Sequence, residues 1–530
     1  MRTPCDEWVV QSARGAVLPA AEAKTWILAA TILGSSMAFI DSTVVNVALP
    51  ALQAKFHVTV VDLQWVVESY GVFLAALILV GGSFGDRFGR RRTFVAGVLI
   101  FALASAGCGL AANIHQLIIA RSIQGAGAAF LVPGSLAIIS TSFDEKARGQ
   151  AIGTWSGFTA ITTAIGPVLG GWLVEHASWR WVFFLNLPIA AAVVAISVWR
   201  IPESRSASAA RVDWCGAILA TTGLGSLVAG FIESSNLGWR NPLVLGSFIL
   251  GVVCLISFVP VEAHVTAPTL PLRLFKSRSF SGANLLTLFL YAAIGIFFFL
   301  FPLNLIQVQR YSTTATGAAV LPLILLMFFL SRWSGGLVAA YGSRTPLILG
   351  PLIVALGFVL FAATSVGSNY WKTFFPAVVV LGLGMAVTVA PLTTVVMNSV
   401  NKERVGTASG INNAVARVAG VLAVAVLGIV MVKAFASRLN YSLAHLSLLP
   451  SILQELQANE IKLAGLQIPA GLSPSMKNTI SAFIGEAFVF GFRVVMLICA
   501  GLSLASTAVA WLMIRDDRHP LDLEAKISRS

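Results

Sequence analysis

A short polar turn between two long apolar runs constrains this chain more than any other feature. Its residues 81–92 read Gly-Gly-Ser-Phe-Gly-Asp-Arg-Phe-Gly-Arg-Arg-Arg. Apolar residues precede the turn from about 63 and resume at about 93, so each flank is long enough to cross roughly 30 Å of hydrocarbon as a helix. The turn must then lie at a membrane face. Its arginines Arg87, Arg90, Arg91 and Arg92 predict the cytoplasmic face by the positive-inside rule.

Composition indicates a polytopic membrane protein. Of 530 residues, 57% are hydrophobic and 11% are charged, which is too apolar for a large soluble domain. The net charge of +13 does not indicate nucleic-acid binding, because the basic residues are scattered between apolar runs. The five cysteines are far apart and the six histidines show no ligand spacing. We therefore expect no disulfide framework, no metal site and no cofactor other than a proton gradient.

Apolar windows predict an all-α protein with fourteen transmembrane helices. An even number places both termini on one side, and about 23 of the 35 Lys and Arg residues fall in the loops of that side. This bias predicts a multi-pass protein of the cytoplasmic (inner or plasma) membrane with both termini in the cytoplasm. The predicted spans are 25–48, 62–84, 93–112, 114–138, 149–175, 180–199, 212–233, 242–262, 281–304, 315–339, 345–366, 373–398, 408–434 and 484–514.

The chain repeats itself, because residues 335–344 resemble the turn at 82–91, with Ala339 in place of Asp86. The repeat predicts two six-helix bundles with two additional transmembrane helices between them. The predicted organisation is an N-terminal tail at 1–24, a first bundle at 25–200, the extra pair with its linkers at 201–280, a second bundle at 281–514 and a C-terminal tail at 515–530.

The second bundle is predicted to include one long external loop, residues 435–483. Its apolar residues, among them Leu443, Ile452 and Leu456, could form an amphipathic helix on the membrane surface or over the mouth of a cavity. A loosely folded external hairpin is the alternative.

Three ionisable residues lie inside predicted spans of the first bundle: Asp41, Glu68 and Arg121. At 1.5 Å per residue, all three lie roughly 9 to 12 Å below the external face. Two carboxylates cannot pair equally well with one guanidinium, so one of them is predicted to carry protons. We interpret Asp41 and Glu68 as the proton-binding or cation-binding acids and Arg121 as the group that sets their affinity. A static buried ion pair is the alternative.

Several motifs are similar to those of the major facilitator superfamily and of its fourteen-span drug:proton antiporters. The resemblance implies that Arg121 is linked to proton transfer, and that Asp86 lies against the N-terminus of the helix predicted at 408–434, where an acid would stabilise one of two bundle arrangements. The matching residues are Gly82, Asp86, Arg87, Gly89, Arg90 and Arg91 in the turn, the run 41–50, Arg121, Gln124, Gly125 and Gly127 in the fourth span, and the landmarks Asp213-Trp214 and Gly238-Trp239.

The fifth predicted span contains Pro167 among glycines that would give the helix one thin face. Pro167 removes a helix hydrogen bond, and a neighbouring helix can slide along such a face. The run resembles the antiporter motif of exporters, although Thr162 stands where glycine is usual. An ordinary kinked packing helix is the alternative. The glycines are Gly153, Gly166, Gly170 and Gly171.

Further polar residues in or next to the predicted spans are candidates for lining a central cavity, or for cross-linking helices. The tenth predicted span carries no acid, which favours monovalent or neutral compounds over divalent cations. The candidates are Asn46, Gln307, Asn412, Asn413 and Arg417.

These features predict a proton-coupled antiporter that exports lipophilic or cationic small molecules by alternating access. The sequence contains no phosphate-binding loop that would indicate ATP hydrolysis, and no catalytic residues or enzyme activity are expected. The expected partners are a small-molecule substrate, protons and the lipid bilayer, with periplasmic adaptor proteins left open. Two alternatives are export of an endogenous metabolite or lipid, and a membrane sensor without transport.

Overall fold

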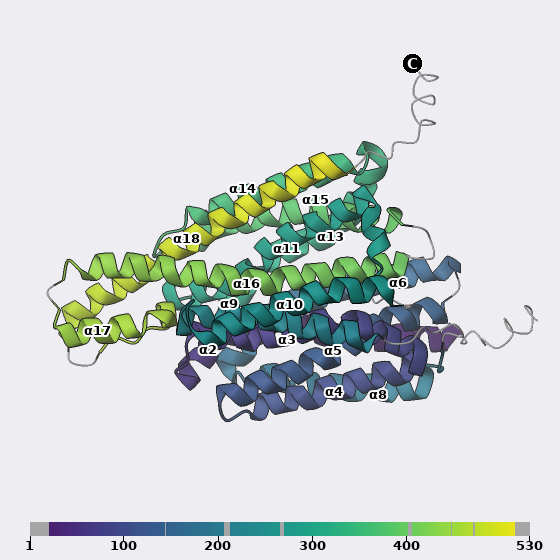
Figure 1. The fold of residues 1–530 in the computed structure, drawn as a ribbon, viewed down its shortest axis with the longest axis horizontal. Coiled ribbons are helices and arrows are strands. Elements are labelled where there is room, and N and C mark those ends of the chain that lie inside the picture. The colour runs from purple at the N-terminus through teal and green to yellow at the C-terminus, as the bar shows by residue number, and fades with distance from the viewer. Residues whose placement is uncertain are drawn as a thin grey trace, which may run out of the picture.

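The structure is a computed structural model, and it describes residues 21–143, 145–205, 213–265, 270–400, 405–446, 448–469 and 472–514. The regular elements in these ranges are helices, as the sequence predicts. Most of the long helices follow the long axis of the molecule (Figure 1). The start of α2 (Ala21–Phe56) and the end of α18 (Pro474–Met513) lie at the same end of the molecule, on the right in Figure 1. We call this the predicted cytoplasmic end and the opposite one the predicted external end.

The first bundle contains the six predicted spans, and polar caps mark several of their starts. Asp62 N donates to Thr59 Oγ1 at 3.3 Å and Thr59 N donates to Asp62 Oδ2 at 2.9 Å, which forms a capping box at the start of α3. Gln116 N donates to Asn113 Oδ1 at the start of α5. The helices are α2 (Ala21–Phe56), α3 (Val60–Phe88), α4 (Arg90–Leu110), α5 (Ile114–Ser142), α6 (Glu145–His176), and the sixth span formed by α7 (Trp181–Phe184) and α8 (Asn186–Arg200).

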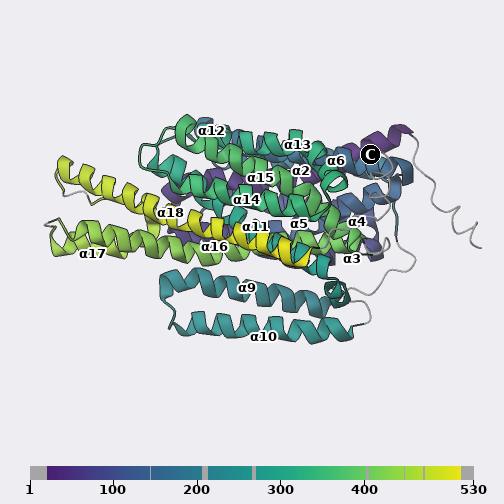
Figure 2. The same cartoon turned by 90° about the horizontal axis from the view of Figure 1, so that it is seen from above.

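Two further helices lie beside the bundles. Helices α9 (Trp214–Leu237) and α10 (Pro242–His264) run side by side along one outer edge of the molecule, with α16 next to them (Figure 2). Asp213 caps α9, because its Oδ1 accepts from Gly216 N at 2.8 Å. Two residues of the landmark motifs therefore mark the limits of α9: Asp213 caps its start, and Gly238, with φ +82°, caps its end.

The second bundle contains six more spans, two of which are continuous with a π-helix. The elements are η1 (Leu272–Lys276), α11 (Arg278–Leu303), the π-helix η2 (Asn304–Val308), α12 (Thr313–Ala319), α13 (Leu321–Tyr341), α14 (Arg344–Ala362), the π-helix η3 (Tyr370–Phe374), α15 (Phe375–Asn398), α16 (Val405–Leu443), α17 (Pro450–Ala458), η5 (Glu460–Gly465) and α18 (Pro474–Met513).

Thirteen helices in the described part of the chain are long and apolar enough to cross a membrane. Each matches one of the fourteen predicted spans. The remaining prediction, 149–175, corresponds to α6, a continuous helix of 32 residues. At 1.5 Å per residue this helix is roughly 48 Å long, which exceeds the hydrocarbon thickness.

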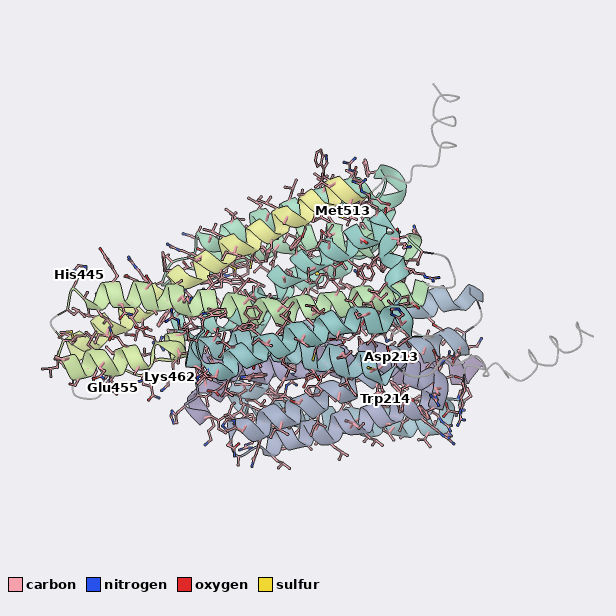
Figure 3. The ribbon with its side chains drawn as sticks, in the orientation of Figure 1. Asp213, Trp214, His445, Glu455, Lys462 and Met513 are labelled. Carbon is pink, nitrogen blue, oxygen red and sulfur yellow. The ribbon has the colours of Figure 1, made fainter. Side chains whose placement is uncertain are left out.

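The predicted external loop 435–483 is shorter than expected. Helix α16 continues to Leu443 and α18 begins at Pro474, so both helices extend past the apolar windows. They protrude beyond the other helices, and α17 lies against this protruding end (Figures 1 and 2). Figure 3 places His445, Glu455 and Lys462 there and Met513 at the opposite end. The connection is helical rather than a loose hairpin, with Leu456 of α17 only 1% exposed.

The two bundles contact each other at the predicted external end. Gln307 Nε2 donates to Gln53 Oε1 at 2.7 Å, and Thr313 Oγ1 donates to the carbonyl of Gly171 at 2.9 Å. Toward the other end, α14 and α18 slant away from α3 and α4 (Figure 1). The described conformation is therefore closed at the predicted external end.

Candidate functional site

A closed triangle of hydrogen bonds joins α2 to α5 inside the first bundle. Arg121 Nη1 lies 2.5 Å from Asp41 Oδ2 and 2.7 Å from Gln124 Oε1, and Gln124 Nε2 donates to Asp41 Oδ1 at 2.9 Å. Arg121 and Gln124 are three residues apart on α5, so both side chains reach the same partner. Asp41 is fully buried and Arg121 is 1% exposed. Each charge thus has a counter-charge in a buried site.

The same arginine also holds α3. Arg121 Nε donates to the carbonyl of Val66 at 3.1 Å, and its guanidinium carbon lies 4.2 Å from the centre of the Tyr70 ring. Removing one partner of such a buried pair typically costs about 3 to 5 kcal/mol, because the other charge stays uncompensated. The triangle can therefore hold α2, α3 and α5 together. Protonation of Asp41 would weaken its hydrogen bonds with both Arg121 and Gln124.

Glu68 does not join this cluster, which corrects the expectation that both acids lie within reach of Arg121. A helix turns by about 100° per residue, so position 68 lies about 200° around α3 from both Val66 and Tyr70, which face Arg121. Residue counting along the helix axis suggested a cluster, but it carried no information on this rotation.

Glu68 instead lies on the face of α3 that meets α16 of the second bundle. On this face Gln64 Nε2 donates to the carbonyl of Val424 at 3.0 Å, and Gly71 packs against Val421. Glu68 is 1% exposed, and its Oε2 has no hydrogen-bond partner among the described residues. A buried carboxyl oxygen without a partner is costly in the ionised form. Glu68 is therefore separate from the ion pair and lies between the two bundles.

The polar turn is organised by two acids, of which the sequence indicated one. Asp86 Oδ1 accepts from Arg90 Nε at 2.9 Å and from Arg90 Nη2 at 2.7 Å. Gly89 has φ +112°, a region that favours glycine. Helix α16 begins at Val405, and residues 401–404 lie outside the described ranges, so the expected contact of Asp86 with that helix start stays a prediction. Arg87 lies over the Phe88 ring.

The second acid is Glu203, which the sequence analysis missed. Its Oε1 and Oε2 accept from the backbone N–H groups of Arg91 and Arg92, both at 3.2 Å, at the start of α4. An acid at a helix N-terminus is favourable. One feature of the sequence could have predicted this role: Glu203 is an isolated acid that closely follows the sixth predicted span in an otherwise basic region.

Glycines of the predicted motifs lie at close helix contacts. A Cβ at Gly125 would overlap the Tyr70 carbonyl, and one at Gly127 would approach Phe101 N of α4 to 2.6 Å. In α6, Gly166 and Gly170 face α2. Of the remaining motif positions, Gly82 lies near Pro133 of α5, and Gly153 lies within α6. Pro167 contacts Gly317 of α12, and Gly171 contacts Thr313 of α12.

Most of the candidate cavity residues form hydrogen bonds with their own helix or with a neighbouring helix. Asn412 Nδ2 donates to Thr287 Oγ1 at 2.7 Å, which links α16 to α11. Asn46 and Asn413 each donate to a carbonyl of their own helix, and Asn413 is exposed. The Arg417 guanidinium carbon lies 5.9 Å from the centre of the Phe39 ring, across the bundle boundary. Cross-linking is therefore the observed arrangement for Asn412 and Gln307.

A cavity that the sequence did not suggest lies between the extra pair and both bundles. Its volume is about 280 Å³, and its lining is almost entirely apolar. Residues from α3, α9, α10, α11 and α16 form its walls, including Val80, Leu224, Phe258, Leu288 and Val415. Such a lining suits a lipophilic molecule or an acyl chain.

Comparisons with known proteins agree with this architecture. The sequence profile described as Major Facilitator Superfamily matches residues 31–216 and 214–424. The chain is 31% identical over 504 residues to the tetracenomycin C resistance and export protein of Streptomyces glaucescens, which covers 93% of each chain. It is 33% identical to the multidrug resistance protein Stp of Mycobacterium tuberculosis, over 93% of this chain and 92% of the relative. Over 78% of this chain and 83% of the relative, it is 34% identical to the puromycin resistance protein pur8 of Streptomyces alboniger.

Solved structures show the same fold. A bacterial homologue of the human lysosomal transporter Spinster superposes with a TM-score of 0.64 and 16% identity, over 94% of this chain and 100% of the other. A D-xylose–proton symporter superposes with a TM-score of 0.60 and 13% identity, over 93% and 98%.

Proposed function

Because the chain belongs to the major facilitator superfamily, and so is a multi-pass membrane transporter of small molecules and not an enzyme, we propose that it is a proton-coupled drug antiporter. In this proposal it exports lipophilic or cationic toxic compounds across the cytoplasmic membrane, with both termini in the cytoplasm. The names of the relatives support the direction and the cargo, since they describe resistance to, or export of, toxic small molecules.

The observation that carries proton coupling is the position of Glu68. Its carboxyl is buried between α3 and α16 without a counter-charge among the described residues, so the cost of ionisation is relieved when it takes up a proton. Because α3 and α16 belong to different bundles, any rocking of the bundles changes the surroundings of this carboxyl. Protonation and conformation are then coupled, as antiport requires.

The proposed cycle uses the closure described above. When the external end opens, the bond between Gln53 and Gln307 breaks, drug leaves, and Glu68 forms an O–H bond with a proton from outside. When the external end closes, Glu68 releases that proton toward the cytoplasm and a new drug molecule binds. Asp41 and Arg121 stay paired and hold the first bundle together while it moves as a body.

The apolar cavity beside the extra pair supports a second substrate class. A cavity of about 280 Å³ with such a lining fits an acyl chain as well as a lipophilic drug. Export of an endogenous lipid is therefore the second candidate function, and it would use the same coupling residue.

The test uses purified protein in sealed vesicles. We expect an imposed pH gradient to drive a fluorescent lipophilic cation uphill, and Glu68→Gln to abolish uphill movement while leaving downhill movement intact. Glu486→Gln, which removes an exposed carboxyl on α18, is the matched control and should behave as wild type. Uphill transport by Glu68→Gln at the wild-type rate would exclude this residue as the proton carrier. A lipid-exchange assay in the same vesicles separates the two substrate classes.

A further inference from the structure

Three unusual backbone positions gather at the predicted external end. Among the described residues, the non-glycine residues with positive φ are His57 (54°), Arg310 (60°) and Leu463 (50°). His57 follows the end of α2, Arg310 follows η2, and Leu463 lies within η5. Each such position costs roughly 1 to 2 kcal/mol, so the surrounding contacts must hold it in place.

A cavity of about 250 Å³ lies among these three segments. Its lining contains three basic side chains, His57, Arg310 and Lys462, and no acidic residue. Neither Arg310 nor Lys462 has a carboxylate within 4.0 Å in the part of the chain that the structure describes. Figure 3 shows Lys462 at this end of the molecule. The cavity therefore gathers basic side chains that form no ion pair with the described carboxylates.

Amide side chains complete the lining. Gln53, Gln307 and Gln467 all line the cavity, and Gln467 Nε2 lies 3.3 Å from His57 Nδ1. Gln53 is buried and fixed on both sides, since its Nε2 donates to the Lys462 carbonyl at 3.0 Å and its Oε1 accepts from Gln307. Basic groups beside such amides in a concave site match the needs of an oxyanion.

We propose that this cavity is a binding site for a phosphate-type oxyanion, either as a free ion or as the headgroup of a lipid. Arg310 and Lys462 supply charged donors, His57 adds a third when protonated, and the cavity shape keeps the anion between them. None of these residues is Glu68 or a member of the hydrogen-bonded triangle of Asp41, Arg121 and Gln124.

The site also has a consequence for conformation. His57 belongs to the first bundle, Arg310 to the second, and Lys462 to the connection between α16 and α18. An anion that contacts all three stabilises the arrangement closed at this end and disfavours an open one. This consequence rests on the proposed alternating-access function, whereas binding itself does not.

Binding is measured on the purified full-length protein in neutral detergent. We expect sodium phosphate to raise the thermal unfolding midpoint in a saturable manner, compared with sodium chloride at equal ionic strength. Arg310→Gln and Lys462→Gln should each weaken phosphate binding by about tenfold or more, as the loss of a charge-assisted hydrogen bond predicts. Lys372→Gln removes an exposed base on η3 outside the cavity and should have no effect. Arg310→Lys should restore part of the binding, which guards against a folding defect.

A second measurement distinguishes the source of the oxyanion. In nanodiscs of phosphatidylcholine, saturable binding of free phosphate assigns the free ion. A stabilisation that requires added phosphatidylglycerol, and that Arg310→Gln abolishes, assigns the lipid headgroup. Equal effects of phosphate and chloride together with no effect of phosphatidylglycerol, or unchanged binding in both Gln variants, would overturn the site. Because no step needs transport, failure here leaves the proposed antiport untouched, and failure of antiport leaves this site untouched.

Discussion

Arg121 and Asp41 form a buried ion pair at 2.5 Å, and Gln124 bonds to both of them. Both atoms that accept a hydrogen bond from Arg121 Nη1, Asp41 Oδ2 and Gln124 Oε1, belong to the first bundle. Glu68, by contrast, has a buried oxygen without a partner on another face of α3. The two acids are therefore in different electrostatic situations, and substitutions should separate their roles.

Asp41→Asn should destabilise the protein. The substitution leaves Arg121 charged and buried without its counter-charge, which we expect to lower the free energy of unfolding by about 3 to 5 kcal/mol. Thermal unfolding in detergent measures this loss. Adding Arg121→Gln should recover part of it in a double-mutant cycle. An Asp41→Asn variant as stable as wild type would contradict a structural role for the pair.

Glu68→Gln should have the opposite effect on stability. Because the substitution removes a carboxyl that can ionise in a buried site, the free energy of unfolding should stay unchanged or rise by up to about 2 kcal/mol. The same unfolding assay measures it, with Glu486→Gln as control. A clear loss of stability would indicate that the Glu68 carboxylate has a partner that the described conformation does not contain.

Gln53→Ala should favour opening of the predicted external end. It removes the bonds from Gln53 to Gln307 and to the Lys462 carbonyl. Two net hydrogen bonds are worth about 1 to 3 kcal/mol, enough to shift a two-state population roughly tenfold. Spin labels at Lys55 and Lys372, in a background without reactive native cysteines, would report a longer distance between the bundles. An unchanged distance distribution would mean that other contacts hold this end closed.

Gly81→Ala should weaken the packing of α3 on α5. A Cβ at Gly81 would overlap the Ala129 carbonyl, and backbone cannot move aside as a flexible side chain can. We expect a loss of about 2 kcal/mol or more. Gly246→Ala in α10 is the matched control, since nothing lies within 4 Å of its Cβ, and it should be neutral or stabilising by up to about 1 kcal/mol. Similar losses in both variants would contradict the close contact.

The sequence was sufficient for the parts of this fold that depend on position along the membrane normal. Span limits follow from apolar length, and Arg121 required a counter-charge that Asp41 supplies. What could not be predicted depends on rotation and on tertiary contacts. Glu68 lies on the face of α3 that meets α16, and Glu203 reaches α4 only because α8 ends beside the polar turn.

Helical segments beyond the predicted spans were also missed by the hydropathy windows. The parts of α16 and α18 near Leu443 and Pro474 are too polar for an apolar window, yet their backbones continue the helix. The basic cavity is a further case, because His57, Arg310 and Lys462 are far apart in sequence and meet only through contacts such as that between Gln53 and Gln307.

The external connection should be more stable at low pH. Burial raises the pKa of Glu460, and the hydrogen bond from Asn440 Nδ2 to its Oε1 at 2.6 Å opposes that shift only in part. With a folded pKa above the unfolded value of about 4.3, folding takes up a proton. The stabilising contribution is then fully present below that unfolded value and is lost as the pH rises through the folded one.

Hydrogen exchange over η5 and the neighbouring end of α17 measures this effect. After correction for intrinsic exchange rates, we expect stronger protection at pH 4.5 than at pH 7, because Glu460 loses solvent in the folded connection and its ionised form therefore destabilises that connection. Glu460→Gln keeps a neutral partner for Asn440 and should remove the difference between the two pH values. Glu455→Gln, at an exposed position on α17, should leave the difference intact. Protection that rises with pH in the wild type would contradict the direction assigned to this pKa.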